Sequence, residues 1–247
     1  MLSLKNISFD AEDENGKISI LKNLSLNLEA QKFTVVTGPN GSGKSTLARI
    51  IAGIEKPTAG SIEFLGKDIT NASITERANM GISFAFQQPV RFKGILVIDL
   101  LRLAAKKNLN RGEACDYLSE VGLCARDYVD REVNASLSGG ELKRIEIATV
   151  MARGAKLTVF DEPEAGIDLW SFQNLISIFQ NMRNNIKDSA IMIISHQERI
   201  LEIADEIVVL NAGEIEKKGR GVLILPKLLK SGQARANCGR AINKEDC

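Results

Sequence analysis

Gly38-Pro39-Asn40-Gly41-Ser42-Gly43-Lys44-Ser45 is the stretch of sequence that decides the fold, because it fits the phosphate-loop pattern G-x-x-x-x-G-K-[ST]. The apolar residues Phe33–Thr37 before it predict a buried strand. The helical apolar spacing of Lys44–Ala52 after it predicts a helix that ends at Gly53. A strand, a glycine loop and a helix in this order are the structural context that the pattern requires.

The loop predicts a binding site for nucleotide phosphates. Its glycines let backbone N–H groups turn inward around phosphate oxygens, and the start of the helix adds the positive end of its dipole. We expect Lys44 to reach the β- and γ-phosphates and Ser45 to ligate Mg²⁺. A chance glycine-rich turn is the alternative, and the flanking strand and helix make it the weaker one.

Two carboxylates follow a second apolar segment. Leu157–Phe160 predicts a buried strand, and Asp161 and Glu162 stand at its end. Such a pair alone is more often a solvated strand end, but beside a phosphate loop it supplies what Mg²⁺ and an attacking water need. We expect Asp161 to hold the water shell of the metal. We expect Glu162 to polarise the water that attacks the γ-phosphate.

Gln87 and His196 each follow a predicted strand, Ile82–Phe86 and Ala190–Ile194. Strands that alternate with helices form a mostly parallel sheet, and the carboxyl ends of parallel strands meet at one edge. Gln87 is therefore expected near Mg²⁺ or the attacking water. His196, the only histidine, is expected to contact the γ-phosphate as a neutral imidazole. The alternatives are a solvated glutamine and a structural histidine.

Leu137-Ser138-Gly139-Gly140-Glu141 predicts a second phosphate-binding turn. Ser138 is suited to cap a helix that begins here, and the two glycines leave backbone N–H groups accessible at its N-terminus. One nucleotide does not need two such turns from one chain. A single phosphate loop therefore does not account for this segment.

The ordered set of motifs is similar to that of ABC ATPases. Segment 137–141 resembles their signature, Asp161-Glu162 their Walker B segment, and Ala165-Gly166-Ile167-Asp168 their D-loop. In that family two subunits pack head to tail, so that each ATP lies between the phosphate loop of one subunit and the signature of the other. The resemblance implies an ATPase whose catalytic residues are Glu162, His196 and Gln87. It also implies that Mg²⁺ is held by Ser45, Gln87 and Asp161. ATP would be bound by Gly38, Pro39, Asn40, Gly41, Ser42, Gly43, Lys44, Ser45 and Thr46 of one copy and by Ser138, Gly139 and Gly140 of the second copy.

The resemblance extends to about Lys230 and implies the α/β fold of ABC ATPases. That fold has a mostly parallel core sheet, an N-terminal antiparallel β subdomain and a helical insert. We expect one ABC ATPase domain over residues 1–230, with the helical subdomain inserted at about 88–136, and a mobile C-terminal tail over residues 231–247. The patterns also predict strands at 2–7, 19–21, 24–28, 61–65, 207–210 and 214–217, and helices at 96–106, 111–121, from 138 onward, 170–185 and 222–229.

The composition limits the function. Lys+Arg 32 against Asp+Glu 31 gives a formal net charge of +1, which does not suggest nucleic-acid binding. No apolar run reaches the roughly 18 residues that span a bilayer, so we expect a cytoplasmic protein without direct membrane insertion. We expect free thiols at Cys115, Cys124, Cys238 and Cys247, which form no CxxC pair. Cluster binding by the last two is the alternative, and two thiols are too few for a four-ligand site.

One feature of the ABC pattern is missing. An aromatic residue that stacks on adenine is expected shortly after the first strand, and its position falls near Ala11. We expect Phe9 to point into the core and Ile18 to offer an apolar contact. The hold on adenine is then weaker than an aromatic stack provides.

Two segments resemble the SufC subfamily of iron–sulfur cluster assembly ATPases: Ala85-Phe86-Gln87-Gln88-Pro89-Val90, and Ser195-His196-Gln197-Glu198-Arg199-Ile200-Leu201. The resemblance implies a soluble scaffold partner similar to SufB and SufD, bound by two copies of the ATPase. The helical insert is shorter than that subfamily's, which implies a smaller scaffold. The alternative partner is the permease subunit of an ABC membrane transporter.

Overall fold

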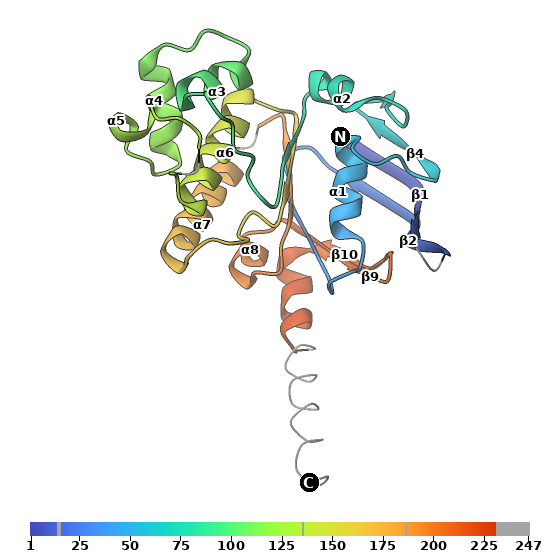
Figure 1. Ribbon diagram of the computed structural model, residues 1–247. Coiled ribbons are helices and arrows are strands. Elements are labelled where there is room, and N and C mark those ends of the chain that lie inside the picture. The colour runs from blue at the N-terminus through green and yellow to red at the C-terminus, as the bar shows by residue number, and fades with distance from the viewer. Residues whose placement is uncertain (14–15, 135, 186, 231–247) are drawn as a thin grey trace.

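A central sheet of six strands organises the computed structural model, which describes residues 1–13, 16–134, 136–185 and 187–230 (Figure 1). The strand order is β10-β9-β3-β8-β7-β6, and every neighbouring pair is parallel except β10 and β9. The predicted mostly parallel sheet is therefore confirmed. The strands are β3 (Phe33–Thr37), β6 (Ile82–Ala85), β7 (Leu157–Asp161), β8 (Ala190–Ile194), β9 (Glu206–Asn211) and β10 (Glu214–Arg220).

Both faces of this sheet are covered, because alternate residues of each buried strand enter different hydrophobic cores. Val35 belongs to a core with residues of α6 (Gly139–Arg153) and α7 (Leu169–Asn184). Its neighbour Val36 belongs to a core with residues of α1 (Lys44–Ala52). This burial on two sides explains why β3, β7 and β8 consist of near-continuous apolar runs.

A second, antiparallel sheet has the order β2-β1-β4-β5 and lies on the other side of α1 from the central sheet (Figure 1). Its strands are β1 (Leu2–Asp13), β2 (Gly16–Leu28), β4 (Ala59–Phe64) and β5 (Lys67–Asp68). The prediction of separate strands at 19–21 and 24–28 was wrong, because β2 continues through Lys22-Asn23. Asn23 has φ 48, a conformation that Asn tolerates, and its N–H donates to Ser8 Oγ at 3.0 Å.

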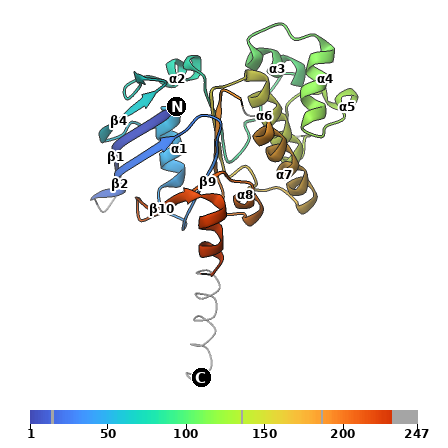
Figure 2. The same cartoon turned by 180° about the vertical axis from the view of Figure 1, so that it is seen from behind.

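Four helices follow β6 and gather at one end of the molecule, opposite the antiparallel sheet (Figure 2). They are α3 (Val97–Ala105), α4 (Arg111–Glu120), α5 (Ala125–Tyr128) and α6. The short α5 was not predicted, and neither was α8 (Glu198–Glu202). Residues 221–230 are helical, which agrees with the predicted helix at 222–229. In the ranges that the structure describes, no helix has the length and apolar character needed to cross a membrane.

Helix α2 (Ile74–Met80) was missed by the sequence patterns, and it supports the helix that follows the phosphate loop. Its Arg77 is 1% exposed and donates to the carbonyl oxygens of Ile50 at 2.6 Å and Ile51 at 3.0 Å, near the end of α1. Arg77 also donates to the carbonyls of Thr70 and Ala72. A buried cation thus adds donors to carbonyls near a helix end, where the ordinary helical hydrogen bonds stop.

Candidate active site

The phosphate loop follows a path that only glycine permits at its first position. Gly38 has φ 141, and a Cβ built there would lie 1.9 Å from the carbonyl oxygen of Leu210. At Gly43, where φ is 95, a Cβ would lie 2.5 Å from Cδ2 of Leu21. The loop between the strand β3 and the helix α1 therefore leaves no room for a side chain at Gly38 or Gly43.

Lys44 is folded back onto this loop. Its Nζ donates to the carbonyl oxygens of Gly38 at 2.9 Å and Pro39 at 2.8 Å, and the side chain is almost fully buried. Burial lowers the pKa of Lys44, while the nearby carboxylates of Glu162 and Asp161 act against that shift. The hydroxyl of Ser42 is buried and has no hydrogen-bond partner among the described residues, so it is free to donate to a phosphate oxygen.

Ser45 and Asp161 meet at the start of α1 and the end of β7. Ser45 Oγ donates to Asp161 Oδ1 at 3.0 Å. Burial raises the pKa of Asp161, and the Ser45 hydrogen bond opposes the shift. A hydroxyl and a carboxylate are hard oxygen donors of the kind that Mg²⁺ selects, so these residues fit a magnesium ion.

Three strand ends converge on Glu162. Gln87 Nε2, after β6, donates to Glu162 Oε2 at 2.7 Å. His196 Nε2, after β8, lies 3.4 Å from Glu162 Oε1. Glu162 itself has the left-handed φ of 43 and donates its backbone N–H to the Ile194 carbonyl at 3.0 Å. The predicted meeting of Gln87, Glu162 and His196 at one sheet edge is present in the structure.

The surroundings of His196 favour its neutral imidazole. Burial lowers its pKa below 6.5, and the positive charge of Lys44 lowers the pKa further, against the opposing charge of Glu162. A neutral imidazole has one N–H to donate and one nitrogen to accept. It can therefore contact either a phosphate oxygen or the Glu162 carboxylate without adding a full charge.

The phosphate-loop pocket has a volume of about 450 Å³ and brings together most of the predicted site. Its lining is Ile20, Asn40, Gly41, Gly43, Lys44, Ser45, Thr46, Gln87 and Glu162. Sequence reasoning missed Ile20, which stands two residues after Ile18 on β2, where the register with β1 shifts. Phe9 packs against a hydrophobic core, as expected, and Ile18 is half exposed.

The signature residues Ser138–Gly140 do not line this pocket. Ser138 caps α6 by accepting from Glu141 N at 3.2 Å, and its own N–H donates to Glu141 Oε2 at 2.6 Å. This reciprocal capping box fixes the helix start. A Cβ at Gly140 would lie 2.8 Å from Ser171 Oγ, so the signature packs closely against the start of α7.

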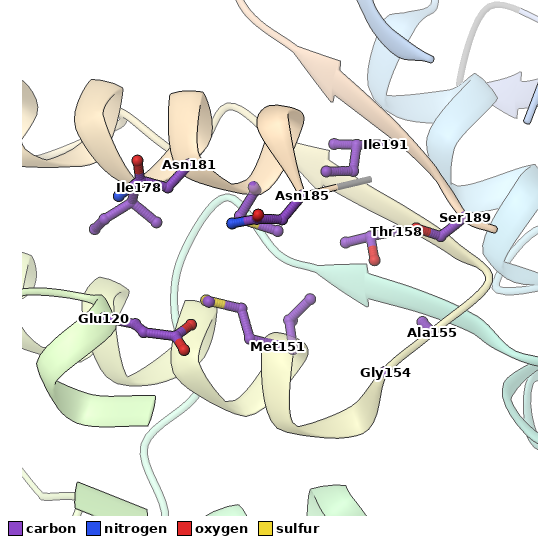
Figure 3. A pocket seen from close by; sticks show the side chains of 12 residues that line it. Glu120, Met151, Gly154, Ala155, Thr158, Ile178, Asn181, Asn185, Ser189 and Ile191 are labelled. Atoms are coloured by element: carbon purple, nitrogen blue, oxygen red, sulfur yellow. The ribbon is translucent and has the colours of Figure 1, made fainter. Parts of the chain in front are cut away.

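Another cavity, of about 520 Å³, lies at the opposite edge of the central sheet (Figure 3). Thr158 and Ser189, near the amino ends of β7 and β8, line it together with Met151 and Asn185 from α6 and the end of α7. The phosphate loop follows the carboxyl end of β3, so this cavity is separate from the candidate site. Cys115 and Cys124 are free thiols away from both, while Cys238, Cys247 and the predicted tail lie outside the described residues.

Comparison with known proteins identifies the family. The family model described as ABC transporter matches residues 21–165. An uncharacterised ABC transporter ATP-binding protein of Methanocaldococcus jannaschii is 40% identical over 212 residues, covering 83% of this chain and 84% of that protein. The probable ATP-dependent transporter SufC of Escherichia coli is 33% identical over 241 residues, which is 91% of this chain and 94% of SufC.

Importer ATPases are similar to the same degree. The spermidine/putrescine import ATP-binding protein PotA of Mesoplasma florum is 33% identical over 224 residues, covering 89% of this chain and 61% of PotA. Among solved structures, the ADP conformation of an ATP-binding cassette of an ABC transporter has a TM-score of 0.76 and 26% identity, and the match covers 93% of this chain and 94% of that one. The phosphate loop, the convergence on Glu162 and these matches agree: the chain belongs to the ABC transporter family and is an ABC ATPase, resembling SufC, that binds and hydrolyses ATP.

Proposed function

We propose that the chain is the ATP-hydrolysing subunit of a cytoplasmic iron–sulfur cluster assembly complex similar to SufBCD. The observation that carries this proposal is the place of the two segments that resemble SufC. Residues 85–90 and 195–201 supply Gln87 and His196, and both side chains reach the same carboxylate, Glu162. The residues that resemble SufC therefore lie where a partner can influence hydrolysis.

In this proposal residues 1–230 form one ABC ATPase domain, and residues 88–136 form its helical subdomain. Glu162 is the general base that accepts a proton from water as the water attacks the γ-phosphate. Gln87 orients that carboxylate and the water. Lys44 leaves the carbonyls of Gly38 and Pro39 to pair with the phosphates, and His196 donates to the γ-phosphate. Magnesium, held by Ser45, Asp161 and Gln87, would neutralise phosphate charge.

The signature, which is the second phosphate-binding turn of the chain, supports a dimer. Ser138–Gly140, at the start of α6, do not line the pocket that contains Lys44, and Ser138 and Gly139 are exposed, so they are available to an ATP bound by another copy. We propose that two copies close around two ATP molecules, each held by one copy's Gly38–Thr46 and by the partner copy's Ser138, Gly139 and Gly140. ATP-dependent closure would then rearrange the bound scaffold.

A surface beside Gln87 suits a protein partner. Phe86 is 45% exposed and Val90 is 49% exposed, and both line a cavity of about 200 Å³. Arg91 and Lys93, also exposed, line an adjacent cavity. Apolar side chains with a basic rim fit a partner segment with an apolar face and acidic edges. We define Phe86, Val90, Arg91 and Lys93 as the partner surface.

Affinity isolation of the tagged protein under anaerobic conditions tests the proposal. We expect a stoichiometric SufB- or SufD-like partner, identified by mass spectrometry, together with iron and acid-labile sulfide. Isolation of a membrane permease instead would overturn the proposal and favour a transporter, which the similarity to PotA motivates.

A matched pair of variants connects the result to the surface. Val90→Asp is expected to abolish co-isolation, because a charge replaces an exposed apolar contact. Leu65→Asp alters a side chain of similar exposure, 51%, in the turn between β4 and β5. It should leave both co-isolation and ATP hydrolysis unchanged. Equal binding by the two variants would contradict the assigned surface.

A further inference from the structure

A buried ion pair inside α6 has no role in the chemistry proposed above. Lys143 Nζ lies 2.7 Å from Glu146 Oε2, and the two side chains are 1% and 16% exposed. Burial raises the pKa of Glu146, and the charge of Lys143 opposes that shift. The environment therefore disfavours the charge of Glu146, and Lys143 is its charged partner on the same helix face.

Both members of this pair also bind the backbone of Phe86. Lys143 Nζ donates to the Phe86 carbonyl oxygen at 2.7 Å. The Phe86 N–H donates to Glu146 Oε1 at 3.1 Å. The backbone C=O and N–H of Phe86 are thus each hydrogen-bonded by a side chain of α6. Strand β6 has ended at Ala85, so the sheet no longer fixes the chain here.

The residue held in this way stands directly before Gln87. The Gln87 amide in turn lies 2.7 Å from Glu162 Oε2. A continuous path of hydrogen bonds and one peptide link therefore runs from α6 to the proposed base. The same helix begins at Ser138, the cap of the signature turn.

The free-energy cost of burying charges favours a positioning role for the Lys143–Glu146 pair over a stabilising one. Burying two charges costs more than their attraction returns in many proteins, and well-packed apolar residues of similar volume often stabilise a core equally well or better. Apolar side chains cannot hydrogen-bond to the backbone of a loop residue. A buried pair that does so fixes the direction of the chain that follows.

We propose that Lys143 and Glu146 are positioning residues that fix Gln87 against Glu162 and couple the signature helix α6 to the proposed base. Neither side chain lines the phosphate-loop pocket. The inference rests on the proposed roles of Gln87 and Glu162, and it applies whichever partner binds the surface beside them. Movement of α6 on dimer closure would move Phe86 and so reset the Gln87 amide.

The double variant Lys143→Met/Glu146→Leu tests the proposal, because it removes both charges and keeps apolar volume in the core. We expect kcat for ATP hydrolysis to fall about 10- to 100-fold with an unchanged KM for ATP, as for loss of a supporting shell around a reactive group. Glu146→Gln retains an amide oxygen for the Phe86 N–H and should keep most of the activity. Amide hydrogen exchange of residues 82–92 should quicken in the double variant and remain slow in Glu146→Gln.

The decisive measurement places the same double change in a Gln87→Ala background. If the pair acts through Gln87, its removal costs no further activity there. If the double change lowers kcat in the Gln87→Ala background as much as it does in the wild type, the effect is generally structural and the proposal is overturned. Wild-type kcat in the Lys143→Met/Glu146→Leu variant would also overturn it. An exposed pair supplies the control: Arg111, at the start of α4, lies 2.6 Å from Asp130, in the turn after α5. Its double change to Met and Leu should leave kcat unchanged. Wild-type hydrolysis by Gln87→Ala would instead refute the proposed role of Gln87.

Discussion

Gln87 Nε2 lies 2.7 Å from Glu162 Oε2, joining the loop after β6 to the end of β7. The same carboxylate has His196 Nε2 at 3.4 Å from its other oxygen. Each oxygen of Glu162 therefore has a nitrogen neighbour, and the carboxylate is oriented before ATP binds. Such prior orientation reduces the reorganisation that the hydrolytic step requires.

Glu162→Gln should slow ATP hydrolysis about 100-fold or more, because an amide does not accept the proton of the attacking water. ATP binding should persist, since the phosphate loop is unchanged, and the variant should accumulate as an ATP-bound dimer. Phosphate release and sedimentation with and without ATP measure both effects. Glu202→Gln, an exposed carboxylate on α8, is the matched control and should behave as wild type. Unimpaired hydrolysis by Glu162→Gln would remove Glu162 from its role.

The stability of the protein should depend on His196 in acid. Its folded-state pKa lies below the usual 6.5, so the unfolded chain takes up the proton first as pH falls. The contribution of His196 to the free energy of unfolding is therefore constant above pH 6.5 and is lost as pH falls through the folded pKa. Urea unfolding of wild type and His196→Gln across this range should give curves that converge or cross in acid. A difference that is independent of pH would contradict the assigned shift.

Arg77→Met should lower the free energy of unfolding by about 3 kcal/mol, because it removes a buried donor from the carbonyl oxygens of Ile50 and Ile51 at the end of α1. Denaturant unfolding measures the change. The control is Arg126→Met, an exposed arginine on α5, for which a change within about 0.5 kcal/mol is expected. Equal stability of the two variants would show that α1 does not depend on Arg77.

Gly38→Ala should destabilise the protein by more than about 3 kcal/mol and abolish ATP binding, since its Cβ would overlap the Leu210 carbonyl at 1.9 Å. Gly154→Ala is the matched control, because Gly154 also has positive φ, 61, but no atom within 4 Å of a built Cβ. That change should cost about 1 kcal/mol from backbone conformation alone. Thermal unfolding and equilibrium binding of ATP separate the two cases.

Local patterns predicted the elements that are buried on both faces. The bounds of β3, α1 and β8 agree with the predicted segments Phe33–Thr37, Lys44–Ala52 and Ala190–Ile194. Their apolar residues are continuous or strictly periodic, and glycine ends the helix at Gly53. Helix α2 was not predicted because its sequence, ITERANM, has no apolar stripe. Its capping box between Ser73 and Glu76 was the available sequence indication.

The place of the proposed catalytic residues was predictable because each one follows a strand in a parallel sheet. The contacts that support them were not. Lys143 and Glu146 at spacing i,i+3 resemble an ordinary solvated pair, and only the packing of the loop after β6 over α6 buries them. Ile20 likewise shares no motif with the phosphate loop that it adjoins. Burial and proximity of this kind arise from tertiary structure.

The left-handed backbone of Glu162 has a consequence for how the protein tolerates change. A non-glycine residue at φ 43 stores about 1 kcal/mol or more of strain, which the native structure sustains at its proposed base. Glu162→Gly would release that strain and should raise the melting temperature while it eliminates turnover. At this position thermal stability and activity oppose each other, so selection for a more heat-resistant protein alone would favour an inactive one.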